Sequence, residues 1–197
     1  MKREKNKENT KRLIMETAIS LFQQKEYQKT TIEEIVFHVG ISKPTFFAYF
    51  PLKEQILYEY DLSQIQYFEE EMAKLIDKNE DLLANLQEKI VYLATSLHTT
   101  PIFTQNMMHL VTISAEYKQL LKRTFDLFQT SLQSYIQFGQ EQNLITDALS
   151  SQLIAKDIIT LYIGTLVNWV IRGGDESLEE LMNTSIGNYL DRVKKLP

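Results

Sequence analysis

Apolar residues recur at helical spacing along most of the chain. Residues 8–25 carry one apolar face, and a second apolar stripe follows the segment KEYQKT, which breaks the period. The first stripe consists of Leu13, Ile14, Thr17, Ala18, Leu21 and Phe22, and the second of Ile32, Ile35, Val36 and Val39. The pattern predicts two helices in the first forty residues. Either Thr30 or Thr31 can cap the second one.

An aromatic-rich stretch, GISKPTFFAYFPLKE, begins where the second stripe ends. Gly40 stands where a left-handed residue ends a helix, and Ser42 is a good N-cap for a new one. Pro44 falls in the first turn of that helix, where a missing N–H costs nothing, and Pro51 closes the helix. Residues 31–49 therefore predict a helix, a tight turn and a second short helix. In DNA-binding proteins of this layout the second helix enters the major groove.

A helical hairpin of this length is common in any α-helical protein, so its length alone says little about function. The distribution of polar residues on the short helix is more informative. Its polar side chains lie on the face opposite its apolar anchors, which are Ile41, Phe46 and Phe50, and the polar set is Lys43, Thr45 and Tyr49. A polar outer face on the second helix favours a DNA-binding interpretation.

Helical patterns continue to the end of the chain. They cover approximately residues 53–78, 81–98, 102–113, 116–142, 151–172 and 176–195. Glycine and proline are scarce, with six and four residues, which also favours long helices. We therefore expect an all-α fold, with a helix-turn-helix domain in residues 1–52 and an all-helical body in residues 53–197.

The charge of the chain is unevenly distributed. Residues 1–53 hold ten Lys and Arg against six Asp and Glu, a balance of +4, whereas the remainder holds eleven against twenty, a balance of −9. This charge asymmetry is expected if the N-terminal region binds nucleic acid. It is equally expected if the basic residues belong to a solvated tail.

Composition excludes several other classes of protein. The chain has no cysteine, so disulfide scaffolds and thiolate metal sites are excluded, and a reducing cytoplasm is the expected compartment. The charged start has no apolar stretch behind it and is not expected to be a signal peptide. The most apolar run, residues 158–171, is expected to be a buried core helix because it is too short to span a bilayer.

The N-terminal motifs together resemble a known family. The stretch TIEEIVFHVGISKPTFFAYFPLKEQIL, with METAISLFQQKEYQKT before it, resembles the DNA-binding domain of TetR/AcrR-type (tetracycline-repressor type) transcriptional regulators. The likeness covers about residues 10–57 and includes the Tyr-Phe-x-x-Lys-Glu signature. Glu26 replaces a glycine that is usual in the family, Phe47 replaces a tyrosine, and Ala48 replaces a basic residue.

The resemblance implies roles for individual residues. Thr31 would bind a DNA phosphate at the N-terminus of its helix, and Tyr49 and Lys53 would clamp the backbone on the other side. Base reading would involve Lys43, Pro44 and Thr45, with Phe47 as a further member. The basic N-terminal tail could follow the DNA backbone or a minor groove, or be disordered.

The family also implies that the body dimerises and binds a small effector. The dimer would use the last two helices, with the candidate residues Ile158, Tyr162, Gly164, Thr165, Trp169 and Leu181. An apolar effector pocket could be lined by Phe103, Met107, Met108, Tyr117, Phe125, Tyr162 and Trp169, although each could equally be plain core. Asp157 and Asn168 are candidates for a buried polar role or for cross-linking a dimer.

His98 and His109 lack metal-ligand spacing, and no other constellation suggests a metal or cofactor. The leading hypothesis is a homodimeric, ligand-responsive transcriptional repressor that binds double-stranded operator DNA and is released by a small apolar or amphipathic effector. An activator, or an effector-independent regulator, remains an alternative. An all-α enzyme or lipid carrier is a third, but no catalytic set of residues supports it.

Overall fold

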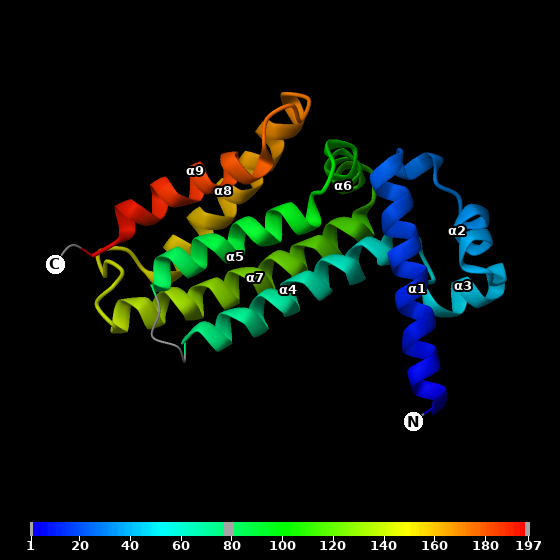
Figure 1. Ribbon diagram of the computed structural model, residues 1–197, viewed down its shortest axis with the longest axis horizontal. Helices are drawn as coiled ribbons and strands as arrows, with labels where there is room; N and C mark the ends of the chain where they lie inside the picture. The colour runs from blue at the N-terminus through cyan, green and yellow to red at the C-terminus, as the bar shows by residue number, and fades with distance from the viewer. Residues whose placement is uncertain (1, 77–80, 196–197) are drawn as a thin grey trace. The chain divides into compact units, whose positions relative to one another are not determined.

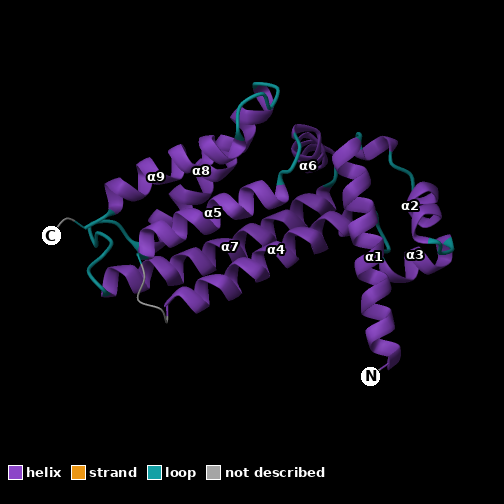
Figure 2. Ribbon diagram, viewed as in Figure 1, coloured by secondary structure: helices purple, strands orange, loops and turns teal. Residues whose placement is uncertain are grey.

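The computed structural model describes residues 2–76 and 81–195. Within these residues every regular element is a helix (Figure 2), so the expected all-α fold is confirmed. The chain forms two compact units. Unit 1 combines Met1–Leu62 with Thr99–Leu121, and unit 2 combines Ser63–His98 with Lys122–Pro197.

Unit 1 contains the helices of the N-terminal region and one helix from later in the chain (Figure 1). Its elements are α1 (Lys2–Gln24), the 3₁₀ turn η1 (Tyr27–Lys29), α2 (Ile32–Val39), α3 (Lys43–Tyr49), α6 (Pro101–Ile113) and the first turns of α4 (Glu54–Ile76) and α7 (Ala115–Glu141). α1 packs against both α2 and α6, and α2 packs against α3. Contacts therefore group α6 with the N-terminal helices, whereas the sequence division at residue 52 places it in the body.

Unit 2 contains α5 (Leu82–Leu97), α8 (Ser151–Ile171), α9 (Leu178–Val193) and the remaining turns of α4 and α7. α9 packs against both α5 and α8 (Figure 1). α8 is 21 residues long, because the helix begins at its Ser150 cap, well before the apolar run seen in the sequence. By length and composition it is the one described helix that could cross a membrane. Within its most apolar window, 44% is buried in the protein.

The turn between α2 and α3 forms for the local reasons that the sequence indicates. Gly40 is left-handed, with φ of +76°, a conformation that costs glycine little. Thr31 caps α2 by accepting from the Glu34 N–H (3.2 Å), and Ser42 caps α3 by accepting from the Thr45 N–H (3.2 Å). Pro44 lies in the first turn of α3.

The core of unit 1 is aromatic and aliphatic. Its fully buried anchors include Ile14, Phe22, Ile35, Phe46, Phe50, Leu57, Phe103 and Tyr117. α3 contributes Phe46 to this core, and Phe50 follows at its C-cap. These two rings hold the short helix in place, because seven residues alone could not form a stable helix in water.

Glu26 shows that the missing family glycine costs no strain. Its φ of −56° and ψ of 134° are ordinary for any residue, and η1 begins directly after it. The backbone between α1 and α2 therefore adopts a conformation that does not require glycine at position 26.

Candidate nucleic-acid interface

α3 presents the start of a polar, solvent-accessible helix face. Lys43 and Pro44 are exposed, and Thr45 is half-buried. The Thr45 hydroxyl shares a 2.8 Å hydrogen bond with Ser42 Oγ, so the side chain is oriented by the cap of its own helix. All three lie in the first turn, next to the three-residue connection from α2.

Lys43 forms an ion pair across the turn. Its Nζ contacts the carboxylate of Glu33 in the first turn of α2, and this contact holds the pKa of Glu33 below its ordinary value. Both side chains are largely exposed, so the pair contributes little to stability and can open when a stronger partner arrives.

Two large aromatic side chains of this region are exposed. Phe47 is 45% exposed and packs edge-to-face on Phe46, while Phe37 on α2 is 80% exposed and contacts His38. The sequence analysis singled out Phe47 but not Phe37. The signal for Phe37 was its position off the stripe of Ile32, Ile35, Val36 and Val39. Tyr49 is half-buried against the core of unit 1.

Lys53 makes intramolecular contacts that the sequence did not indicate. Its Nζ donates to the backbone oxygens of Tyr27 and Thr30, each at 2.8 Å, and lies 3.8 Å from the centre of the Tyr27 ring. The side chain is half-buried, and burial lowers the pKa of the ammonium group.

Asn106 on α6 is a buried polar residue that the sequence analysis missed. Its Nδ2 donates to Phe22 O (3.0 Å) and Lys25 O (3.1 Å), and its Oδ1 accepts from Tyr27 N–H (2.8 Å). Thr100 adds a bond from its hydroxyl to Gln23 O (3.1 Å). Side chains of α6 and its cap thus bind the end of α1.

Asp61 was also missed, although the sequence carries a signal for it. It occupies the gap in the α4 stripe formed by Leu57, Ile65, Phe68 and Met72, one helical turn from Leu57 and from Ile65. The side chain is buried, and neither carboxylate oxygen has a hydrogen-bond partner among the described residues. Burial raises the pKa of Asp61 well above its ordinary value, because it disfavours the charged form of the carboxyl group.

The predicted effector residues fall in two different units. Phe103, Met107 and Tyr117 are buried in the core of unit 1, where Met108 is half-buried. Phe125, Tyr162 and Trp169 belong to unit 2, where Phe125 is half-buried and the other two are buried. A single pocket lined by all seven residues therefore stays a prediction.

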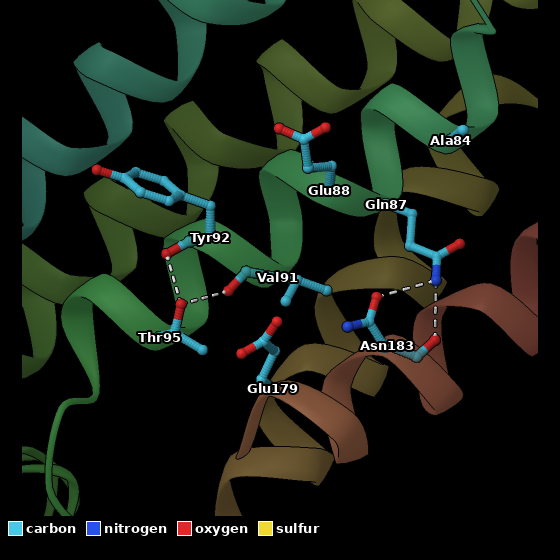
Figure 3. A pocket seen from close by; sticks show the side chains of 8 residues that line it. All are labelled: Ala84, Gln87, Glu88, Val91, Tyr92, Thr95, Glu179 and Asn183. Carbon is cyan, nitrogen blue, oxygen red and sulfur yellow. Dashed lines mark hydrogen bonds between the residues drawn. The ribbon is translucent and has the colours of Figure 1, made fainter. Parts of the chain in front are cut away.

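A groove of about 590 Å³ lies between α5 and α9 in unit 2 (Figure 3). It is lined by Ala84, Gln87, Glu88, Val91, Tyr92, Thr95, Glu179 and Asn183, and contains none of the predicted effector residues. Gln87 Nε2 crosses it to donate to the backbone and side-chain oxygens of Asn183 (3.1 and 3.2 Å), which ties α5 to α9.

The predicted dimer residues divide into a buried and an accessible set. Ile158, Tyr162, Thr165 and Trp169 form the inward side of α8 and are buried in unit 2 itself. Trp169 Nε1 also donates to Glu176 O (2.9 Å). Gly164 is exposed, and Leu181 is half-buried. Four of the six candidate residues are therefore buried within unit 2 itself, and the dimer interface stays a prediction.

Two further polar candidates of α8 have partners within unit 2. Asp157 accepts a 2.8 Å hydrogen bond from the Tyr189 hydroxyl on α9, and Asn168 is exposed and accepts from Arg172 Nε (3.2 Å). Asn168 is therefore not buried within unit 2, and a role in cross-linking a dimer stays a prediction. Among the described residues no group of three or more His, Cys, Asp or Glu side chains could hold a metal ion.

Comparison with known proteins adds independent information on the N-terminal region. Residues 14–60 match the family described as bacterial regulatory proteins, tetR family. The chain is 46% identical over 57 residues to the uncharacterized HTH-type transcriptional regulator YuxN of Bacillus subtilis (strain 168). The match covers 29% of this chain and only 18% of that relative's length.

Solved structures show the same fold over nearly the whole chain. A TetR-family transcriptional regulator from Syntrophomonas wolfei aligns with a TM-score of 0.77 and 19% identity, covering 95% of this chain and 96% of that one. Thermus thermophilus FadR in complex with lauroyl-CoA gives 0.70 and 20% over 91% and 93% of the two chains. Bacillus subtilis FadR with stearoyl-CoA gives 0.71 and 19% over 90% and 96%. At these identities the likeness establishes the fold.

Proposed function

The chain belongs to the tetR family of bacterial regulatory proteins through its residues 14–60, and we propose that it is a homodimeric transcriptional repressor that binds operator DNA. The observation that carries the proposal is the exposed first turn of α3, which places Lys43, Pro44 and Thr45 directly after a three-residue turn from α2. This is the geometry in which a recognition helix reads base edges in the major groove.

The contacts divide into positioning and reading. Thr31 at the start of α2 and Tyr49 near the end of α3 would bind phosphates, which fix the register on the duplex. Lys43 would reach guanine acceptors once it leaves Glu33, and Pro44 and Thr45 would contact a thymine methyl group. Phe47 offers an exposed ring for the same purpose.

We assign the dimer interface to the outward face of α8. Its exposed apolar residues Leu153, Ile163 and Ile171 lie on one side of the helix, and Ile171 is 77% exposed. Gly164 lies on the same side, with open space where a Cβ would stand, so another backbone can approach closely there. A two-fold dimer would present its two α3 helices to successive major grooves, ~34 Å apart.

We assign the effector to the class of small apolar or amphipathic molecules. Two proteins of similar fold hold acyl-CoA, which supports an effector with a long apolar part. Such a molecule would release the DNA only if it bound the released conformation more tightly than the DNA-bound one. A reducing cytoplasm, where the DNA and acyl-CoA are found, is the proposed compartment.

An activator, or a regulator without an effector, is the alternative within the same family. The two differ in one measurement, the expression of the controlled genes in a deletion strain, which rises for a repressor and falls for an activator. An enzyme is not supported, because the matched family and the curated relative are transcriptional regulators.

The proposal is tested by fluorescence anisotropy with DNA from upstream of the protein's own gene and with a shuffled sequence of equal length. We expect tighter binding to the upstream DNA and a linear fall of log K with log salt concentration. Addition of lauroyl-CoA, with free CoA as the control, tests release. Equal, salt-independent affinity for both DNAs would refute DNA-binding regulation.

A further inference from the structure

The chain between α1 and α2 is held by two side chains that are distant from it in the sequence. Asn106 comes from α6, and Lys53 precedes α4. Between them they bond the backbone of Phe22, Lys25, Tyr27 and Thr30 at 2.8–3.1 Å.

Asn106 replaces a cap that α1 lacks. The last carbonyl oxygens of a helix have no partner within the helix, and many helices satisfy them with a left-handed glycine. α1 ends without glycine, and Asn106 donates to one of these oxygens, Phe22 O, and to Lys25 O directly after the helix, while its own Oδ1 accepts the Tyr27 N–H. The Nδ2 and Oδ1 groups of this buried side chain are thus both hydrogen-bonded. The position of Asn106 therefore fixes where α1 ends and where η1 begins.

Lys53 holds the other end of the same segment. It bonds the oxygens of Tyr27 and Thr30, which lie on either side of η1, and the Tyr27 ring lies beneath its ammonium group. Thr30 directly precedes Thr31, the N-cap of α2. The position of Lys53 therefore determines the position of the first turn of α2.

We propose that Lys53 and Asn106 are positioning residues of the DNA interface, and that Lys53 fixes the start of α2 instead of binding a DNA phosphate. The proposal rests on the proposed DNA-binding function. Two of the three N–H groups of Lys53 are already directed at backbone oxygens, and the half-buried ammonium lies against a ring. A phosphate ligand would instead present its charge to solvent.

Hydrogen exchange of the DNA-free protein tests the positioning role directly. In the Lys53→Met variant the amides of Lys29, Thr30 and Ile35, which are bonded within η1 and the first turn of α2, should exchange at least about tenfold faster than in the wild type. Lys29→Met is the matched control, since Lys29 is exposed in the same turn and pairs only with Glu26. Unchanged exchange in Lys53→Met would overturn the proposal.

DNA binding separates the two roles of Lys53. Removing a phosphate contact lowers the slope of log K against log salt by ~0.9, whereas removing a positioning contact leaves the slope and weakens binding at every salt concentration. We expect Lys53→Met to bind about tenfold more weakly with an unchanged slope. A slope reduced by ~0.9 would overturn the proposal.

Lys53→Arg guards against a variant that simply unfolds. Arginine keeps the positive charge, so a phosphate contact would survive the change, but its planar group donates in fixed directions that differ from those of the ammonium group. We expect faster exchange and weaker DNA binding in this variant as well. Wild-type affinity together with wild-type exchange would contradict the proposed role.

Asn106→Asp tests the second residue with little change of shape. The acceptor for Tyr27 N–H is kept, but both donors to α1 are replaced by an oxygen that faces carbonyl oxygens. Exchange at residues 25–30 should rise, and DNA affinity should fall with the slope unchanged. Gln105→Glu, an exposed neighbour on α6, supplies the same charge change as a control. Equal effects from both variants would overturn the role of Asn106.

If the wild type does not bind the DNA at all, the proposed function fails. The positioning of α2 by Lys53 and Asn106 is then decided by the hydrogen-exchange data alone.

Discussion

The two units use buried polar groups differently. In unit 1 Asn106 makes three backbone hydrogen bonds, while Asp61 and the hydroxyl groups of Tyr27 and Tyr117 have no hydrogen-bond partner among the described residues. In unit 2 the buried polar residues are His98, Thr124 and Thr165. Unit 2 also carries the exposed apolar face of α8.

The difference indicates what each unit does. Unit 1 contains buried polar contacts that fix the backbone around the DNA-reading helices, because such bonds are directional and apolar packing is not. Unit 2 is packed mainly by apolar contacts and leaves apolar surface on α8 for association. Asp61 in unit 1 and His98 in unit 2 are buried titratable residues, and we expect them to make stability depend on pH in opposite directions.

The largest effect should come from Asp61→Asn. The raised pKa of Asp61 keeps it neutral when folded, whereas the unfolded chain ionises near pH 4. The free energy of unfolding therefore falls by up to about 1.4 kcal/mol per pH unit as pH rises from 4 towards the folded pKa. Asparagine removes this dependence, so the stability of the variant relative to the wild type should increase as the pH rises above about 4.

Urea unfolding at four pH values measures this. Tyr117 and Tyr27, whose pKa values are raised, stay neutral over this range and do not interfere. Asp126→Asn on the exposed face of α7 is the control. A pH dependence identical to that of the wild type would show that Asp61 is not neutral in the fold.

The opposite response is expected from His98 in unit 2. Burial lowers the pKa of His98 to about 3, so the imidazole stays neutral in the fold while the unfolded chain protonates near pH 6.5. Stability that is present above pH 6.5 is lost as pH falls, by about 2 kcal/mol at pH 5. His98→Gln should remove this loss.

We compare how the free energy of unfolding changes with pH in the variant and in the wild type. A packing defect in the variant lowers this free energy equally at every pH and therefore cancels. His109→Gln, on the exposed side of α6, serves as the control because it is expected to retain the wild-type slope. If His98→Gln retains it too, the histidine is not the source of the acid sensitivity.

Gly164→Leu tests the outward face of α8. A Cβ at this position meets nothing within 4 Å, so the folded unit should accept the larger side chain. At a close helix interface the same side chain would separate the two backbones, and the dimer dissociation constant should rise at least about tenfold. Sedimentation equilibrium measures the constant, and Gln137→Leu on the exposed face of α7 is the control. An unchanged constant would place the interface elsewhere.

The smallest effect is expected from Phe47→Tyr. The ring is already exposed and fixed by Phe46, so the added hydroxyl can bond a phosphate without rearrangement. One such bond contributes about 1 kcal/mol, which corresponds to about fivefold tighter binding to all DNA sequences alike. Anisotropy titrations on two unrelated sequences measure it. A gain on one sequence alone would show that the added hydroxyl bonds a base instead of a phosphate.

The elements that the sequence predicted well are those with local causes. Gly40, Ser42 and Pro44 act through their own backbone conformation or a cap bond three residues away, so the turn and both its helices could be read without the rest of the chain. α1 was predicted to begin at residue 8 but begins at Lys2, because a polar segment can extend a helix without contributing to its apolar stripe.

The candidate site could be predicted only in part, because side-chain roles depend on distant partners. The family motif implies that Lys53 binds a DNA phosphate. In the structure its Nζ instead donates to the backbone oxygens of Tyr27 and Thr30, which lie 26 and 23 residues earlier in the sequence. Apolar character alone could not show which residues of α8 face inward, since the helix is apolar on most sides. Tyr162 and Trp169 are buried in unit 2 because α8 packs against α9.

The sequence by itself determined the helices, the turn between α2 and α3, and the family, because helical periodicity and capping act over a few residues. Only the tertiary structure decided that α6 binds the end of α1 and that Asp61 is buried. The structure was also needed to show that Lys53 bonds the backbone oxygens of Tyr27 and Thr30, and that the face of α8 containing Gly164 is exposed. These outcomes depend on hydrogen bonds and burial between segments up to 84 residues apart, and no local pattern encodes such partners.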